Sequence, residues 1–115
     1  MPRAFDEREL LERIDNDWEF LSETVQMLGE DGPTLMEEIR SAVQRGDAPA
    51  VGRAAHTLKG MISNFCAPQA QASAFDVERI GKSGDLSAAH AAVGSLQKDL
   101  DGLVTDLTAL LATRR

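Results

Sequence analysis

Apolar residues recur through the last third of the chain at alternating intervals of three and four positions. The members of this seam are Leu86, Ala89, Val93, Leu96, Leu100, Leu103, Leu107 and Leu110. Because an α-helix completes one turn in 3.6 residues, this spacing places all of them on one helical face. The pattern therefore predicts a long amphipathic helix over residues 86–110, with Asp85 as its N-cap.

Four earlier segments show the same helical periodicity. We predict helices from an Asp6 cap to about Ile14, and over about Asp17–Gln44, Ala48–Phe65 and Pro68–Lys82. The inward positions predicted for the second helix are Leu21, Val25, Leu28, Leu35, Ile39 and Ala42. Those predicted for the third are Val51, Ala54, Ala55, Leu58, Ile62 and Phe65, and those for the fourth are Ala70, Ala74, Val77 and Ile80.

Residues that start or interrupt helices lie at the boundaries of these segments or within them. The short polar side chains of Asp6, Asn16 and Asp47 can each accept a backbone N–H at a helix N-terminus. Pro33 lies inside the second segment, where a proline removes one backbone hydrogen bond. We therefore predict one long kinked helix there, with a complete break as the alternative.

The composition suits a helical fold, because hydrophobic residues make up 43% of the chain while aromatic residues make up only 4%. Short turns between amphipathic helices make consecutive helices antiparallel neighbours. We therefore predict an all-α fold, an antiparallel four-helix bundle with a short N-terminal capping helix. A two-chain coiled coil would use the same seam in the last helix, but the other amphipathic helices of the chain favour the bundle.

The charge and the apolar stretches of the chain exclude several classes of partner. A net charge of −7 without a basic cluster argues against binding to nucleic acid or to an anionic membrane. No stretch approaches the roughly 18 apolar residues of a membrane span, and the N-terminus lacks the long apolar run of a signal peptide. With Cys66 as its single cysteine, the chain has no internal disulfide. We expect a cytoplasmic monomer.

His56 is the residue in the third predicted helix that points to chemistry. It lies off the apolar stripe, on the flank expected to face solvent, with Gly52 and Gly60 one turn before and after it. A glycine inside a helix costs about 1 kcal/mol relative to alanine. Since neither glycine is expected to face the core, we interpret them as keeping the surface around the imidazole open to a partner.

A histidine in this setting can carry a phosphoryl group. Imidazole has an unperturbed pKa near 6.5, so much of it is a neutral nucleophile near pH 7. Lys59, three residues after His56, can reach the negative charge of a phosphoryl group on the ring. The sequence has no P-loop and no kinase-type glycine loop that would bind a nucleotide. The residues alone also allow a surface histidine with incidental glycines.

The run AAHTLKG over residues 54–60 resembles the His-x-Leu-Lys-Gly signature of histidine phosphotransfer (HPt) domains. The similarity covers almost the whole chain, including the turn at 45–47 and the segments at 64–68 and 78–85. It implies that residues 1–115 form a single histidine phosphotransfer domain. In such a domain His56 accepts a phosphoryl group from the phospho-aspartate of a receiver domain and passes it to another receiver.

The resemblance also implies partners and roles for neighbouring residues. The partners would be response-regulator receivers and a hybrid sensor histidine kinase, with magnesium on the receiver and no cofactor or metal on this phosphoryl carrier. Lys59 would stabilise the phosphoryl group, and Glu78 would orient the imidazole by a hydrogen bond. The predicted docking surface consists of Gly52, Gly60, Met61 and Ser63.

Three positions depart from the family pattern, namely Met61, Ser63 and Cys66, where smaller residues are usual. We interpret them as affecting the choice of partner more than the chemistry of His56. Two alternatives remain open. One is an adaptor that binds receivers without being phosphorylated, and the other is a phosphoacceptor fragment of a chemotaxis-type histidine kinase.

Overall fold

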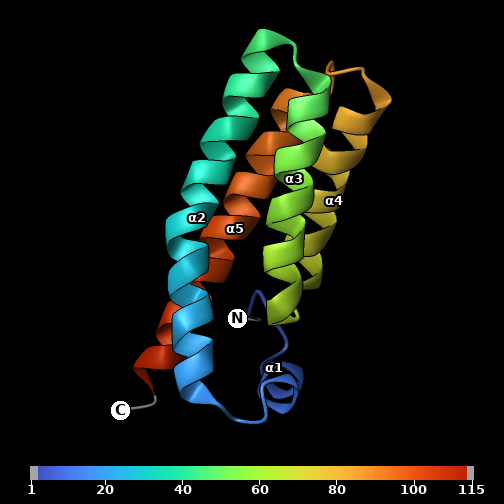
Figure 1. Ribbon diagram of the computed structural model, residues 1–115. Coiled ribbons are helices and arrows are strands. Elements are labelled where there is room, and N and C mark those ends of the chain that lie inside the picture. Colours follow the sequence, from blue (N-terminus) through green and yellow to red (C-terminus); the bar gives the residue numbers. More distant parts are fainter. Residues whose placement is uncertain (1–2, 114–115) are drawn as a thin grey trace.

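The computed structural model describes residues 3–113, and within that range the chain is helical and contains no strand, as predicted (Figure 1). Residues 1–2 and 114–115, the two ends of the predicted 1–115 domain, lie outside the described residues. None of the described helices is long and apolar enough to cross a membrane. The elements are α1 (Glu7–Arg13), α2 (Trp18–Arg45), α3 (Ala48–Ile62), the 3-10 turn η1 (Ser63–Phe65), α4 (Pro68–Ser83) and α5 (Ala89–Ala112).

The four longer helices lie alongside one another, and the short α1 lies across one end of α3 (Figure 1). Helix α3 packs against α2 and α4, and α5 packs against the same two helices. The backbone N–H of Asp6 donates to the carbonyl of Cys66 at 3.0 Å, which ties the start of α1 to the turn after η1. The resulting molecule is elongated, with principal extents of 45 × 23 × 20 Å.

The core follows the predicted apolar stripes closely on α3 and α5. Seven of the eight seam residues, from Ala89 to Leu110, are buried, as are all six positions predicted for the third segment. Helix α5 begins at Ala89, three residues later than predicted. Asp85 does not cap it, because its carboxylate accepts the backbone N–H of Ser87 at 3.0 Å and shapes the preceding turn. Leu86 is partly buried against the core from that turn.

Of the four predicted N-caps, Asp6 and Asp47 are correct, while Asp85 and Asn16 are wrong. The carboxylates of Asp6 and Asp47 accept the backbone N–H three residues ahead, at 3.0 and 3.1 Å. The cap of α2 is Asp17 and not Asn16. Asn16 has a positive φ of 57°, a conformation that its short polar side chain tolerates, and it therefore belongs to the turn before the helix.

Helix α2 continues through Pro33 as a single element, so the alternative of a complete break is wrong. Leu35 was predicted to be inward but is only partly buried, while Gly32 and Met36 are buried. The reason is the close approach of α5, since a Cβ added at Gly32 would lie 3.4 Å from Leu100. The buried face of α2 is centred on that contact, which leaves Leu35 at its edge.

Candidate functional site

His56 lies on the exposed side of α3, with 68% of its side chain accessible, and it is paired with a buried carboxylate on α4. Its Nδ1 atom lies 2.7 Å from Oε2 of Glu78, whose side chain is 1% exposed. An ionised carboxylate can only accept, so Nδ1 is the donor. In the neutral imidazole the free lone pair is therefore on Nε2, the nitrogen of the ring that Glu78 does not engage.

Two lysines complete a cluster around the same carboxylate. The Nζ atom of Lys59 lies 2.6 Å from Oε1 of Glu78, and the Nζ atom of Lys82 lies 3.0 Å from Oε2. The Lys59 ammonium is the strongest influence on the pKa of Glu78, and Lys82 and His56 act in the same direction. Although burial opposes them, together they lower the pKa of Glu78 to about 2. Glu78 is therefore ionised at any pH near neutral.

The pair of glycines where α3 meets α4 explains how Glu78 reaches His56. A Cβ added at Gly81 would lie 2.4 Å from the backbone N and 2.7 Å from the Cα of Gly52, so the two backbones touch at this point. Contact this close brings α4 near enough for the carboxylate of a buried Glu78 to hydrogen-bond the exposed flank of α3.

The burial of Gly52 therefore differs from the prediction, which placed this glycine on the flank facing solvent. It is buried against α4, with an added Cβ 3.6 Å from the backbone N of Lys82, and helix packing accounts for it. The helical wheel placed Gly52 off the apolar stripe, but the approach of α4 covers that flank. Gly60 is exposed, and an added Cβ would meet nothing within 4 Å beyond its own helical turn, which fits the open surface expected there.

Met61 and Ser63 are partly buried next to this open surface. Met61 packs against the core, and the hydroxyl of Ser63 donates to the carbonyl of Gly60 at 2.6 Å. Their part in docking a partner, like that of Gly52 and Gly60, stays a prediction.

Sequence reasoning did not select Lys82 or Phe75, which both adjoin the site. Lys82 is four residues after Glu78 on α4, a spacing that places the two side chains on the same face of a helix. The Lys59 ammonium lies 5.1 Å from the ring centroid of Phe75, within the range of a cation–π contact, and the ring is half exposed. The i,i+4 spacing from Glu78 could have indicated Lys82 from the sequence. On the same helix, Ile80 was predicted to face inward, and it is only partly buried.

A shallow hollow of about 460 Å³ adjoins His56. The residues that line it are Pro49, Gly52, Arg53, His56, Thr57, Glu78, Gly81 and Lys82. It contains two cations, Arg53 and Lys82, whereas Lys59 lies outside it. Within residues 3–113, no group of three or more His, Cys, Asp or Glu side chains is placed to hold a metal ion.

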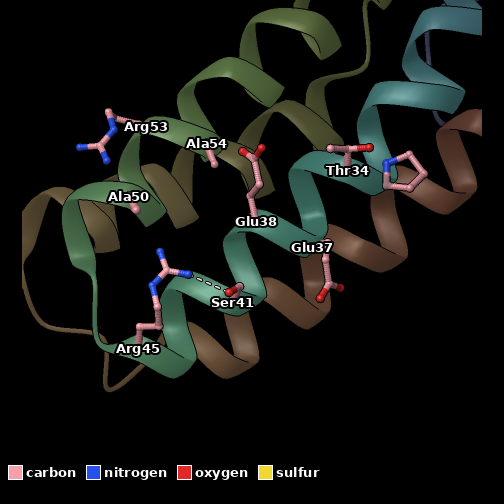
Figure 2. A pocket seen from close by; sticks show the side chains of 9 residues that line it. Thr34, Glu37, Glu38, Ser41, Arg45, Ala50, Arg53 and Ala54 are labelled. Carbon is pink, nitrogen blue, oxygen red and sulfur yellow. Dashed lines mark hydrogen bonds between the residues drawn. The ribbon is translucent and has the colours of Figure 1, made fainter.

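A larger groove of about 730 Å³ runs between α2 and α3 but does not include His56 (Figure 2). Its charged side chains have both signs, since Glu37, Glu38 and Arg45 of α2 all line it. Nη1 of Arg45 donates to the Ser41 hydroxyl at 2.7 Å. Figure 2 shows Arg53 extending away from the two glutamates. No histidine or cysteine lines this groove, and the hollow beside His56 is the stronger candidate site.

The comparisons with known proteins agree with the fold and with the motif. The model of the Hpt domain family matches residues 23–110, which is most of the chain and includes His56. Among solved structures, the chain is similar to histidine-containing phosphotransfer protein B (HptB) from Pseudomonas aeruginosa PAO1. The TM-score is 0.81 with 22% sequence identity, over 100% of each chain, a likeness that concerns the fold. No curated protein sequence matches the chain.

Proposed function

The chain belongs to the Hpt domain family, whose members act as phosphocarriers in phosphorelays, and on that premise we propose a specific transfer route. His56 accepts a phosphoryl group from the phospho-aspartate of one receiver domain and passes it to another receiver. The partners are response-regulator receivers and a hybrid sensor histidine kinase. The receiver holds the magnesium ion, and this chain acts without a cofactor, a nucleotide site or a metal of its own.

The observation that carries the proposal is the hydrogen bond between an exposed imidazole and a buried, ionised carboxylate. Glu78 holds the proton on Nδ1 of His56, so the lone pair of Nε2 attacks phosphorus in line. An N–P bond forms as the P–O bond to the receiver aspartate breaks, and the aspartate leaves as a carboxylate with the electron pair. The ring gains positive charge during this step, and the carboxylate of Glu78 stabilises it.

The same cluster supports a role for Lys59 in balancing charge. A phosphoryl group on Nε2 brings negative charge close to Glu78, and like charges at short range repel each other. Lys59 lies against Glu78 on the far side of the carboxylate from the hydrogen bond to His56. We propose that Lys59 offsets part of the negative charge of the ionised Glu78, which weakens its repulsion of the phosphoryl group, in place of the direct phosphoryl contact that the resemblance implied.

The proposal includes the arrangement of the helices. We propose an antiparallel four-helix bundle formed by α2–α5, with α1 covering one end, as one domain over residues 1–115. The mutual packing of the four long helices and the hydrogen bond between Asp6 and Cys66 support it.

The direct test is phosphate uptake from a phosphorylated receiver in the presence of magnesium. We expect acid-labile, alkali-stable phosphate on the wild-type chain and on His90→Gln, which changes the other histidine of the sequence, exposed on α5. His56→Gln should take up none while keeping the helical circular dichroism spectrum of the wild type. Uptake by His56→Gln, or none by the wild type with any receiver tested, would overturn the proposed function.

A further inference from the structure

The hollow beside His56 contains two cations for which neither the motif nor the transfer route provides a role. Lys82 reaches it from α4, and Arg53 reaches it from α3, three residues before His56 and therefore on the same side of the helix. Lys59, the cation of the motif, does not line it. We propose that Lys82 and Arg53 form an anion subsite that binds the phosphoryl group on His56. This inference rests on the proposed function.

The exposure of the two lysines indicates which of them can change partner. The side chain of Lys59 is 24% exposed and lies between Glu78 and the ring of Phe75. The side chain of Lys82 is 71% exposed. Long exposed side chains change rotamer at little cost, whereas an enclosed one must break its packing first. Lys82 is therefore the more mobile of the two ammonium groups.

The pairing of the carboxylate leads to the same assignment. Lys59 contacts Oε1 of Glu78, while Lys82 shares Oε2 with Nδ1 of His56. If Lys82 leaves, both carboxylate oxygens keep a partner. If Lys59 leaves, Oε1 loses its cation contact in a site that is 1% exposed, and an unpaired buried charge is strongly destabilising. The phosphoryl group therefore recruits Lys82, and Lys59 stays on Glu78.

Arg53 supplies a second positive charge to the same hollow. Its side chain is on the exposed flank of α3, and a guanidinium offers a planar set of donors that matches phosphate oxygens. A phosphoryl group carries about −1.5 to −2 charge near pH 7. One ammonium and one guanidinium balance that charge, although the chain as a whole has a net charge of −7.

The test is the pKa of the phosphoryl group itself, measured by ³¹P NMR titration after phosphorylation of His56 with phosphoramidate, a small-molecule donor that needs no receiver. A bound cation favours the more negative form of the phosphoryl group, so its loss raises this pKa. We expect Lys82→Gln and Arg53→Gln to raise it, Lys82→Arg to restore it, and Lys98→Gln, an exposed lysine on α5, to leave it unchanged. The shift for Lys82→Gln should exceed that for Lys59→Gln, and an equal or reversed order would overturn the subsite.

A second measurement uses the unphosphorylated chain and inorganic phosphate as the probe. Saturable shifts are expected for the backbone amides of Arg53, His56 and Lys82, with binding several-fold weaker in Lys82→Gln than in Lys98→Gln. Unchanged binding in Lys82→Gln, or no saturable binding to the wild type, would contradict the proposal. If receivers fail to label His56 but this binding is present, the transfer route is wrong and the anion subsite stands.

Discussion

Nδ1 of His56 and Oε2 of Glu78 lie 2.7 Å apart, which joins an exposed imidazole on α3 to a buried carboxylate on α4. The neutral ring therefore holds its proton on Nδ1 and has its lone pair on Nε2, the nitrogen that we propose to be phosphorylated. In the proposed transfer, the reactivity of His56 therefore depends on a second helix.

Replacing Glu78 by alanine should slow phosphorylation of His56 by roughly tenfold or more. A hydrogen bond to a charged group contributes about 1.5–3 kcal/mol, and each 1.4 kcal/mol lost from the transition state is a factor of about ten in rate. Phosphate uptake from a phosphorylated receiver measures the rate of phosphorylation, and ¹⁵N NMR of the histidine ring shows whether the proton leaves Nδ1. Glu38→Ala, an exposed glutamate on α2, is the control. A wild-type rate in Glu78→Ala would show that Glu78 does not assist the reaction.

Stability should fall at acid pH because of Glu78. Its pKa is about 2 in the folded chain and about 4.5 when unfolded, so the unfolded chain binds the proton first as the pH drops. The stabilising contribution, on the order of 3 kcal/mol, is complete above pH 4.5 and is lost as the pH falls toward 2. Urea unfolding of the wild type and Glu78→Gln between pH 6 and 2.5 should give a stability difference that shrinks with acid. A difference independent of pH would contradict the ion-pair cluster.

Two glycine substitutions, Gly81→Ala on α4 and Gly60→Ala on α3, should have opposite effects on the free energy of unfolding. Gly81→Ala places a Cβ 2.4 Å from the backbone of Gly52, so α3 and α4 must separate, at a cost of about 1–3 kcal/mol. Gly60→Ala meets no such neighbour within 4 Å and should stabilise the helix by about 0.5–1 kcal/mol. The free energies of unfolding in urea measure both effects, and a Gly81→Ala chain as stable as the wild type would argue against the close contact.

Much of the fold could be predicted from the sequence, because the apolar seams repeat at helical spacing and local groups decide the caps. The seam of α5 is buried from Ala89 to Leu110, and Asp6 and Asp47 cap their helices. The wrong caps, Asn16 and Asp85, lie in turns whose backbone shape the sequence pattern did not indicate, and the errors in burial lie where a second helix packs. Leu35 is displaced from the core by the approach of α5 to Gly32, and a helical wheel contains no information about a neighbour.

The site was predictable in part for the same reason. The motif indicated His56 and Lys59, and the resemblance indicated Glu78, since each is visible in the local sequence. The role of Gly52 in packing and the position of Lys82 beside the imidazole depend on the contact between α3 and α4. That contact is made by the backbone atoms of Gly52 and Gly81, which are far apart in the chain, and no local sequence pattern indicates it.

The central claim is that Glu78 directs phosphorylation to one nitrogen of His56. The most direct measurement is NMR of the ¹⁵N-labelled chain after phosphate uptake from a receiver, in which ³¹P–¹⁵N coupling identifies the phosphorylated nitrogen. We predict a single phosphohistidine with phosphorus on Nε2 of His56. Phosphorus on Nδ1, or on any residue other than His56, would contradict the account.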